Sequence, residues 1–250
     1  KGAKPFVAAG VLDGAERVFG LHTAYDLEAG TVGLKPGINN AAVDHFRIRV
    51  HGRSTHVSTP HMGVDALYIA SQIVVAVQGL VTRRTSPTEP VIIGIGKLNA
   101  GTTYNAVAAF AEMEGTTRTI SQESRDRVRA QVSETAQSIA ALYGGTAEIE
   151  WTDFAAALVN DPQVCEEAAQ VVDELLGEGH VVTDRELSLS GDNFAEFELY
   201  KPGAYAYLGT GNPDLPHTMI TNHNGGFDVD ENALVTGAGL YVGYTVARLG

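Results

Sequence analysis

Between residues 43 and 153 the spacing of apolar residues switches between strand-like and helix-like in a fixed order, and this limits the possible folds more than any other feature. Residues 43–51 (VDHFRIRVH) alternate between apolar and polar side chains, as a strand with one buried face does. Residues 63–84 carry a helical pattern, and the segments PVIIGIGKLN and AVAAFAEMEGTTRT after them both favour strands. The order so far is strand, helix, strand, strand.

A second helix and a fourth strand complete this pattern. Ser121 is a natural N-cap for the helix, Gly144 and Gly145 are a natural stop, and TAEIEWT alternates again after them. The sequence therefore predicts a ferredoxin-like β-α-β-β-α-β domain, with four antiparallel strands and two helices on one face. We expect the apolar stripes of the helices to be Val64, Leu67, Val74, Val77 and Val81 in the first, and Val128, Val132, Thr135, Ile139 and Leu142 in the second.

The segments on either side are typical of one larger α/β domain. The first of them contains a short helix (GAKPFVAAGVL), a buried strand (ERVFGLH) that we expect to end at His22, and a second strand (GTVGLKPG). After the fourth strand of the β-α-β-β-α-β domain, DPQV has the form of a helix start, GAYAYLG favours a strand, and DENAL opens a final helix. We therefore predict a small domain at residues 43–153, inserted into an α/β domain made of residues 1–42 and 154–250.

Composition argues against several classes of function. The net charge of −13 opposes binding to a phosphate backbone, so we expect no nucleic-acid partner. No apolar run approaches the roughly 18 residues that a membrane-spanning helix needs, and no secretory signal is visible, so we expect a cytoplasmic protein without a membrane partner. The single cysteine, Cys165, lies in a helical pattern, and we expect it to be a small core residue.

Histidines are the residues most able to carry chemistry in this chain. His22 follows an apolar strand, and ligands gather at the carboxyl ends of strands in α/β sheets. His223 lies in a polar loop beside Asp228 and Asp230, and His56 lies in a turn between a strand and a helix (RVHGRSTHVSTPHMGVDA). Three further histidines are expected to be surface or hydrogen-bonded core residues, namely His45, His51 and His180.

Motifs of several other enzyme classes are absent from the sequence. It contains no GxSxG elbow, no HExxH helix, no paired CxxC and no Walker loop. Its glycines do not form a dinucleotide fingerprint, and a lone cysteine within a helix is a poor nucleophile. The sequence therefore gives no support to serine-hydrolase, thiol or nucleotide-dependent chemistry.

Five stretches, taken together and in order, resemble one family of metallohydrolases. They are VFGLHTAYDLEAGTVGLKPG, FRIRVHGRSTHVSTPHMGVDALYIASQIV, GTTYNAVAAFAEMEGTTRT, SGDNFAEF and NHNGGFDVDENAL. The family is that of the dinuclear-zinc amidohydrolases and peptidases, which includes aminoacylase, carboxypeptidase G and succinyl-diaminopimelate desuccinylase. Within it the chain is most similar to hippurate hydrolase, N-acyl amino acid amidohydrolases and auxin-conjugate hydrolases.

The resemblance implies a catalytic domain that binds two divalent metal ions, usually zinc with manganese or cobalt as alternatives, and a lid that dimerises. By matched position, it implies that His22 and His223 are metal ligands. It implies that His56 reaches the active site of the partner subunit and stabilises the oxyanion of the tetrahedral intermediate. It also implies that Asn105 and Arg118 bind the carboxylate of the substrate.

Two departures from the family pattern concern acidic residues. Where the family has Gly-Glu-Asp-Phe, this chain has Gly191-Asp192-Asn193-Phe194. Gly191 matches the glycine whose backbone lines the substrate pocket, and the changed acids weaken the expected support around it. The family's cysteine-histidine-aspartate and Pro-Ala-Glu-Glu segments, which supply the bridging aspartate, the other ligands and the general-base glutamate, are missing from these 250 residues.

The sequence leaves two functions open. The preferred one is metal-dependent hydrolysis of the amide bond of N-acyl amino acids or small peptides by a homodimer. In that case the chain is part of a longer enzyme and is inactive alone, because two histidines do not hold a pair of catalytic ions. The alternative is a non-catalytic dimerisation or ligand-binding module derived from the same family, which the missing ligands together with Asp192 and Asn193 favour.

Overall fold

The computed structural model describes residues 2–249, whose contacts divide into two compact units. The lid unit comprises residues 41–157 and 189–191, and the α/β unit comprises the other described residues. The predicted lid boundaries, 43 and 153, lie two and four residues inside the main segment of the lid unit. The short segment 189–191, which the sequence analysis placed in the C-terminal part of the α/β domain, packs with the lid unit.

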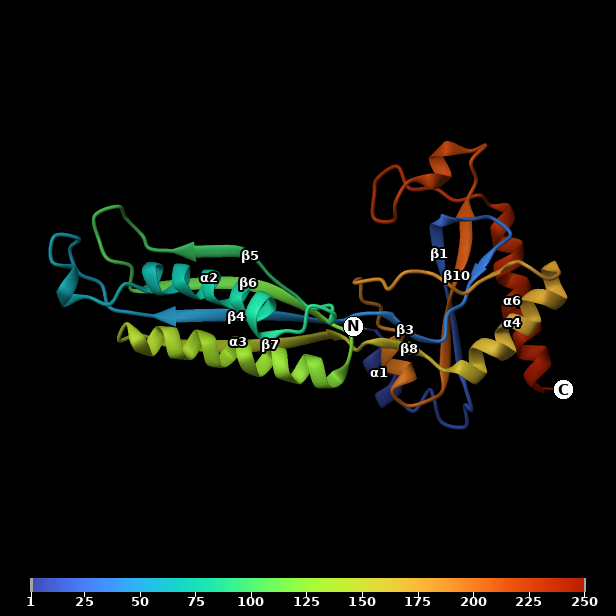
Figure 1. Cartoon of the computed structure of the whole chain (residues 1–250), viewed down its shortest axis with the longest axis horizontal. Coiled ribbons are helices and arrows are strands. Elements are labelled where there is room, and N and C mark those ends of the chain that lie inside the picture. Colours follow the sequence, from blue (N-terminus) through green and yellow to red (C-terminus); the bar gives the residue numbers. More distant parts are fainter. Residues whose placement is uncertain (1, 250) are drawn as a thin grey trace. The chain divides into compact units, whose positions relative to one another are not determined.

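The lid unit is a four-stranded antiparallel sheet with two helices packed on it (Figure 1). The strand order β5-β6-β4-β7 is that of a ferredoxin-like fold, so the predicted fold is confirmed. The elements, in chain order, are β4 (Ala42–His51), a 3₁₀ helix η1 (Pro60–Met62), α2 (Ala66–Arg84), β5 (Ile92–Ala100), β6 (Phe110–Thr119), α3 (Gln122–Leu142) and β7 (Thr146–Ala155).

The core of the lid unit lies between the sheet and the helices. Phe46, Ile48 and Val50 on β4 are fully buried, as the alternation of this strand predicts. Gly115 faces Phe46 from the neighbouring strand, and a Cβ atom there would lie 2.3 Å from the Phe46 ring. The large aromatic side chain is therefore accommodated because its neighbour has none.

The predicted helical stripes are wrong in part. Leu67 and Leu142 are 49% and 74% exposed instead of facing the core. Asp65 caps α2 by accepting hydrogen bonds from two backbone N–H groups of the first turn, and this fixes where the helix starts and which face meets the sheet. The buried face is Ala66, Ile69, Ala70, Ile73, Val77 and Leu80. Small alanines allow the helix to approach the sheet closely, which a search for large apolar residues misses.

Local signals at the helix ends are confirmed. The Ser121 hydroxyl accepts from the Ser124 N–H at 3.1 Å at the start of α3, and Gly144 follows the helix with φ of +80°. Asp161 caps the next helix with proline directly after it. These residues act through contacts with their immediate neighbours, so the sequence alone suffices to identify them.

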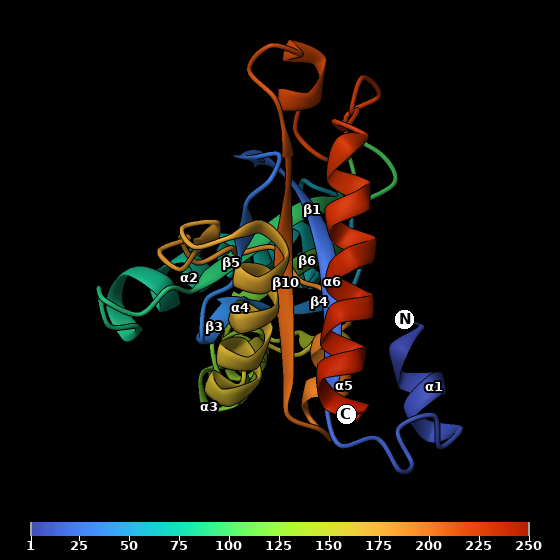
Figure 2. The same cartoon turned by 90° about the vertical axis from the view of Figure 1, so that its right-hand side faces the viewer.

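The α/β unit is built on a sheet with the strand order β1-β10-β2-β9, in which β1 and β10 pair in parallel. Helices α4 and α6 lie side by side over one face of this sheet (Figure 2) and share a core with it. Cys165 is buried in that core, as predicted. The elements are α1 (Ala3–Ala8), β1 (Val18–Glu28), β2 (Val32–Gly33), β3 (Gly37–Asn40), β8 (Leu158–Asn160), α4 (Pro162–Leu176), β9 (Val181–Val182), α5 (Ala195–Glu198), β10 (Gly203–Gly211), η2 (Pro216–Met219) and α6 (Asn232–Leu249).

His22 lies inside a strand and not at its end, which corrects the prediction from the sequence. β1 continues through TAYDLE to Glu28, and residues 18–24 pair with β10 without interruption. Asp26 and Glu28 near the strand end give it the polar character of a loop, but both are exposed, and after an irregularity Glu28 pairs again with Gly211 of β10. The second predicted strand, GTVGLKPG, is also shorter, because only Val32 and Gly33 pair within the sheet.

Helix α2 has the length and apolar composition that a membrane-spanning helix needs, with a mean hydropathy of 1.3, and it is the one such helix between residues 2 and 249. The search of the sequence missed it because scattered polar residues interrupt the apolar run. Ile69, Ile73 and Val77 of this helix are fully buried in the lid core. A core helix passes the same test, so composition here is weak evidence for a membrane.

Candidate active site

The turn after β4 and the loop before β6 lie together at one end of the lid sheet. The Val57 N–H donates to the Asn105 carbonyl at 3.1 Å, and His56 forms an antiparallel bridge with the residue after Asn105. The structure therefore brings the two candidate residues His56 and Asn105 onto one connected piece of backbone, with both side chains exposed. We call this piece, residues 53–62 and 101–107, the lid tip.

The imidazole of His56 is tied to its own turn. Its Nδ1 atom lies 2.7 Å from Ser58 Oγ and 3.2 Å from the Ser58 backbone nitrogen. The N–H and hydroxyl of Thr59 both donate to the His56 carbonyl, at 2.9 and 3.2 Å. Nε2 of His56 has no hydrogen-bond partner in the described part of the chain, so this edge of the ring is free for a ligand.

Arg118 lies at the other end of the lid sheet, where β6 pairs with the first residues of β4. Its guanidinium contacts the Thr116 hydroxyl at 3.0 Å and the Thr117 carbonyl at 3.4 Å, and no carboxylate among residues 2–249 pairs with it. Burial lowers the pKa of Arg118, although it stays charged at any physiological pH. A half-buried guanidinium without an acidic partner is suited to bind a carboxylate from elsewhere.

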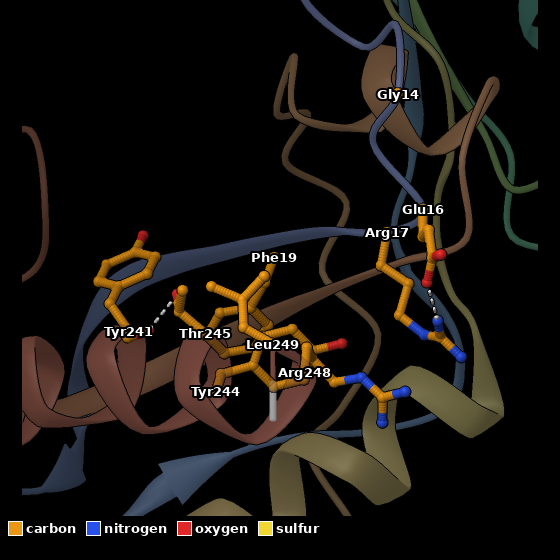
Figure 3. Close-up of a pocket in the computed structure, with 9 residues that line it drawn as sticks. All are labelled: Gly14, Glu16, Arg17, Phe19, Tyr241, Tyr244, Thr245, Arg248 and Leu249. Carbon is orange, nitrogen blue, oxygen red and sulfur yellow. Dashed lines mark hydrogen bonds and ion pairs between the residues drawn. The ribbon is translucent and has the colours of Figure 1, made fainter.

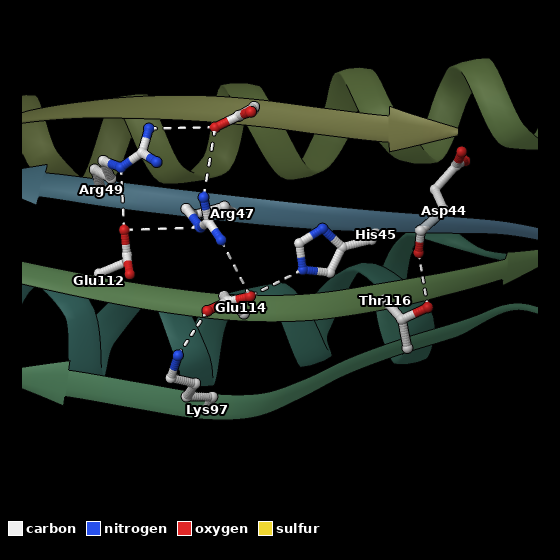
Figure 4. Close-up of polar contacts among 9 residues, drawn as sticks. Asp44, His45, Arg47, Arg49, Lys97, Glu112, Glu114 and Thr116 are labelled. Carbon is white, nitrogen blue, oxygen red and sulfur yellow. Dashed lines mark hydrogen bonds and ion pairs between the residues drawn. The ribbon is translucent and has the colours of Figure 1, made fainter. Parts of the chain in front are cut away.

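Other charged groups on the open face of the sheet are paired (Figure 4). Arg47 and Arg49 on β4 form ion pairs with glutamates on both neighbouring strands. A hydrogen bond from Lys97, followed by one from His45, lowers the pKa of Glu114 to about 2. His45 and His51 thus lie on a charged surface beside carboxylates, as expected for histidines without a catalytic role.

The distance along the sheet separates Arg118 from the lid tip. Arg118 pairs with Val43, whereas the tip begins after His51, which pairs with Phe110. His51 lies eight positions after Val43 along β4, which corresponds to about 26 Å at the usual rise per residue. The structure therefore does not bring Arg118 together with His56 and Asn105 within one chain.

In the α/β unit, β1 places His22 on the sheet face that carries Tyr205 and Tyr207, with ring centroids 6.0 and 6.1 Å away. His22 Nδ1 lies 2.7 Å from the Thr23 carbonyl oxygen, which can only accept, so Nδ1 carries the proton. In the neutral ring the lone pair is then on Nε2. This is the state in which an imidazole binds a metal ion.

The loop between β10 and α6 carries His223, which is exposed, and contacts β1 through the neighbouring residue Asn222. His223 has φ of +64°, the one positive value for a non-glycine residue between residues 2 and 249. The side chain of its neighbour Asn222 donates to the Thr23 carbonyl at 3.4 Å, so this carbonyl serves both His22 and the His223 loop. Such a strained backbone is characteristic of functional sites.

These features fit a metal ion as part of a larger ligand set. The available Nε2 of His22 is a suitable donor, and the Oδ1 of Asn222 is buried without a hydrogen-bond partner in the described region. No group of three or more His, Cys, Asp or Glu between residues 2 and 249 could hold a metal ion, whereas catalytic zinc normally has three protein ligands. His22 and His223 alone do not complete such a site.

The segment Gly191 to Phe194 has structural roles that the sequence analysis did not anticipate. A Cβ atom on Gly191 would lie 2.3 Å from the Val43 side chain, so close packing within the lid unit requires glycine here. Asp192 accepts from the Phe194 N–H at 2.7 Å and from the Tyr205 hydroxyl at 2.8 Å. The shorter acid therefore organises its own turn, and burial with the nearby Asp192 charge raises the pKa of Tyr205.

Sequence reasoning also missed Ser58, Asn222 and Glu198. Ser58 and Asn222 are adjacent or nearly adjacent to candidate histidines, and this proximity is the signal that could have found them. Burial raises the pKa of Glu198 to about 7, against a backbone hydrogen bond from Val159 that lowers it. No sequence pattern marks Glu198, since its environment arises only on folding.

A separate pocket of about 480 Å³ lies between β1 and α6 (Figure 3). Its lining includes Arg17, Phe19, Tyr244 and Arg248, and none of the residues predicted as site residues. Phe19 is on the opposite face of β1 from His22, since the two are three residues apart in an alternating strand. This pocket is therefore distinct from the candidate metal ligands.

Comparisons with known proteins show which proteins this chain is similar to. Residues 41–143 match the M20 peptidase dimerisation domain. The chain is 34% identical to thermostable carboxypeptidase 1 of Saccharolobus solfataricus over 95% of its own length and 59% of the relative. It is 34% identical to N-acetyl-L-cysteine deacetylase of Bacillus subtilis over 94% of its own length and 54% of the relative. The chain thus spans little more than half the length of these relatives.

Solved structures give the same assignment. A Bacillus subtilis protein described as a dinuclear metal-binding peptidase of the M20 family is 31% identical and superposes with a TM-score of 0.79, covering 99% of this chain and 61% of that one. An aminohydrolase structure from methicillin-resistant Staphylococcus aureus is 28% identical, with a TM-score of 0.89 over 99% of this chain and 62% of that one. Residues 41–143 are therefore an M20 peptidase dimerisation domain, and nearly the whole chain is similar to amidohydrolases and metal-binding peptidases of the M20 family.

Proposed function

We propose that this chain is part of a metal-dependent hydrolase that cleaves the amide bond of N-acyl amino acids or small peptides and acts as a homodimer. The observation that carries the proposal is the separation of Arg118 from His56 and Asn105 by about 26 Å of lid sheet. A substrate of two to three residues spans only about 10 Å, so it cannot contact both ends of one lid. In a two-fold dimer, the lid tip of one chain can meet the Arg118 of the other.

Arg118 is proposed to bind the carboxylate of the substrate. Its guanidinium presents paired N–H donors that suit a carboxylate, and its burial strengthens that interaction. The two relatives named above support the same substrate feature. N-acetylcysteine has a free carboxylate beside the amide that a deacetylase cleaves, and so does the substrate of a carboxypeptidase.

The lid tip is proposed to act on the other side of the scissile amide. His56 has an open Nε2 edge, and the Asn105 side-chain amide lies on the same piece of backbone. Both offer groups that can donate to an oxygen atom on which negative charge develops. Removal of one such donor typically costs about 10²–10³ in kcat.

The α/β unit is proposed to contribute metal ligands. His22 and His223 would hold part of a dinuclear site, with the remaining ligands outside residues 2–249. Divalent ions bound there would supply Lewis-acid activation of the attacking water and of the acyl oxygen. The Thr23 carbonyl fixes the His22 ring, and Asn222, the residue next to His223, donates to the same carbonyl.

The proposal can be tested with the complete polypeptide that contains this chain. Its kcat/KM would be compared for N-acetyl amino acids and for the same compounds with the carboxylate capped as an amide. Loss of a charged hydrogen bond costs about 1.5–3 kcal/mol, so the free acids should be preferred by roughly 10- to 150-fold. Arg118→Met should abolish this preference, whereas Arg49→Met, on the same sheet face but already paired with glutamates, should retain it.

Two results would overturn the proposal. One is that the complete polypeptide, loaded with zinc, manganese or cobalt, hydrolyses no N-acyl amino acid or small peptide. The other is that Arg118→Met keeps the full preference for free acids.

A non-catalytic module of the same family is the second candidate, favoured by the lack of a three-ligand group in the described residues and by Asp192 and Asn193. It predicts a complete polypeptide that dimerises but holds no stoichiometric metal. Metal analysis of the purified dimer therefore distinguishes the two functions.

A further inference from the structure

We propose that Ser58 is a positioning residue that fixes His56 in the tautomer with the proton on Nε2, so that His56 acts as a hydrogen-bond donor and not as a base. The relevance to catalysis rests on the proposed function, whereas the tautomer itself does not. The inference comes from the contacts of a single ring nitrogen.

The first step concerns the Ser58 backbone. Its N–H lies 3.2 Å from His56 Nδ1, and a backbone N–H can only donate. A proton on Nδ1 would face this donor directly, which is unfavourable. Nδ1 must therefore accept, and the neutral ring carries its one proton on Nε2.

The second step concerns the Ser58 hydroxyl. Oγ lies 2.7 Å from Nδ1, a distance at the short end for a hydrogen bond to nitrogen. Because Nδ1 already accepts from the N–H, the hydroxyl also donates to it. Two donors from one residue thus converge on the same lone pair, and both favour the same tautomer.

The third step concerns the backbone that carries these groups. Thr59 closes the turn onto the His56 carbonyl, and His56 is bridged to the loop that carries Asn105. The ring is thus held by one nitrogen and its backbone by a second set of contacts. The remaining nitrogen, Nε2, has no partner in the part of the chain that the structure describes.

The chemical consequence is a choice between two roles. With the proton on Nε2, the open edge of the ring donates to an oxygen that gains negative charge during amide hydrolysis. With the other tautomer, the same edge would present a lone pair and repel that oxygen. Ser58 therefore excludes a general-base role for the free edge of His56 while the ring is neutral.

The tautomer can be measured on the chain of residues 1–250, without activity. Histidine labelled with ¹⁵N would be examined by long-range ¹H–¹⁵N correlation at pH about 8, where free imidazole is neutral. We expect a protonated Nε2 and an unprotonated Nδ1 for His56. In Ser58→Ala the Nδ1 resonance should shift, whereas the His22 resonances should stay unchanged. A proton on Nδ1 in the parent chain, or an unchanged Nδ1 resonance in the variant, would overturn the inference.

The role of Ser58 in catalysis can be measured on the complete, metal-loaded polypeptide. Ser58→Ala should lower kcat roughly 3- to 10-fold, the effect of one weak hydrogen bond, with KM and metal content unchanged. Ser58→Thr keeps both donors and should restore kcat. Ser71→Ala removes a hydroxyl that donates to the Tyr68 carbonyl within α2, outside the lid tip, and should change kcat less than twofold.

The resonance measurement and the kinetic measurement together distinguish failure of this inference from failure of the proposed function. If Ser58→Ala leaves kcat unchanged, or if Ser58→Thr does not restore it, Ser58 does not position the ring for catalysis and the inference fails. If the complete polypeptide has no hydrolase activity, the proposed function fails, and the resonances of His56 still decide the tautomer.

Discussion

His22 in the α/β unit and His56 in the lid tip have rings that are held in opposite ways. In the α/β unit, His22 Nδ1 faces the carbonyl of Thr23, an acceptor, so its Nε2 carries a lone pair. At the lid tip, His56 Nδ1 faces the N–H and hydroxyl of Ser58, so its Nε2 carries a proton. One side chain is thus suited to bind a cation and the other to stabilise an anion.

The comparison shows that the partner of one ring nitrogen decides what the other can do. Both partners lie within two residues of the histidine, yet the residue type alone does not predict them. The partner of His22 is a backbone carbonyl, which every residue has, and its availability depends on the geometry of β1. The role of a histidine therefore follows from the backbone around it as much as from its place in a motif.

Removing the cation-binding histidine should have the largest effect. In the complete polypeptide, His22→Ala should lose both bound metal and activity. Loss of a residue that only hydrogen-bonds to a metal ligand costs roughly 10–100-fold in metal affinity or activity, and loss of the ligand itself should cost more. Metal content by mass spectrometry of the native protein and kcat/KM would be measured. His180→Ala is the control, because His180 Nδ1 also contacts a carbonyl, that of Gly30, but His180 is no candidate ligand. Full metal content in His22→Ala would show that His22 is not a metal ligand.

Removing His56, the proposed oxyanion donor, should lower kcat far more than it changes KM. His56→Ala should lower kcat about 10²–10³-fold, with a much smaller change in KM and unchanged metal content, because the contact strengthens in the transition state. The measurement is steady-state kinetics together with metal analysis.

Mixing the two variants tests whether the histidines meet across a dimer. A dimer of one His22→Ala chain and one His56→Ala chain has one intact site, so random exchange should recover roughly a quarter of the parent activity. No recovery despite proven subunit exchange would show that His56 does not act on the partner subunit.

A further prediction separates the fold of the lid from the chemistry of its tip. Asp44 and Arg125 form a buried bidentate ion pair in the lid unit, with contacts of 2.9 and 2.6 Å. Asp44→Asn leaves the buried guanidinium without its main partner and should lower the free energy of unfolding by about 3 kcal/mol. Denaturant titration would measure this, with Glu148→Gln, which removes an exposed contact to His51, as a control expected within about 0.5 kcal/mol. The tautomer of His56 should be unchanged in both.

The smallest effect is expected from Glu198, in the α/β unit. Burial raises its pKa from 4.5 to about 7, so between these values the folded chain holds a proton that the unfolded chain has released. The stability contributed is therefore complete below pH about 4.5 and is lost as the pH rises through 7. Glu198→Gln has no carboxyl group to titrate and so does not show this loss. The free energy of unfolding of the variant, relative to that of the parent chain, should therefore be about 1–2 kcal/mol higher at pH 8 than at pH 5. Thermal unfolding of both proteins across this range would measure it, and parallel pH profiles would contradict it.

The fold of the lid could be predicted from sequence because its signals are local and repeated. The alternation around Phe46, the cap at Ser121 and the glycine after α3 each act within a few residues. The phase of the helices could not be predicted as well, because Ala66 and Ala70 face the sheet where close approach matters more than side-chain size. The end of β1 was missed because pairing with β10 outweighs the polar character of its last residues.

The site was predictable only as far as its residue types follow the family pattern. That pattern proposed His22, His56 and Arg118, but it could not show that Arg118 has no acidic partner among residues 2–249 while Arg49 has one. Nor could it show that Gly191 packs against Val43, which gives the glycine a steric role beside any contact with substrate. Such facts depend on which strands become neighbours.

The pairing of β3 with β8 also governs how freely the lid can vary. Asn40, the last residue before the lid unit, pairs with Leu158, the first residue after it, so the two ends of the insertion are already neighbours in an antiparallel ladder. Within the α/β unit, the two ends of this main lid segment are therefore paired as the two strands of a hairpin are. A chain that exchanged the whole lid for a short turn would lower the entropy cost of closing that loop by about 3 kcal/mol. The segment between β3 and β8 can therefore diverge in sequence without changing the strand pairing at its base, provided that it still packs with residues 189–191.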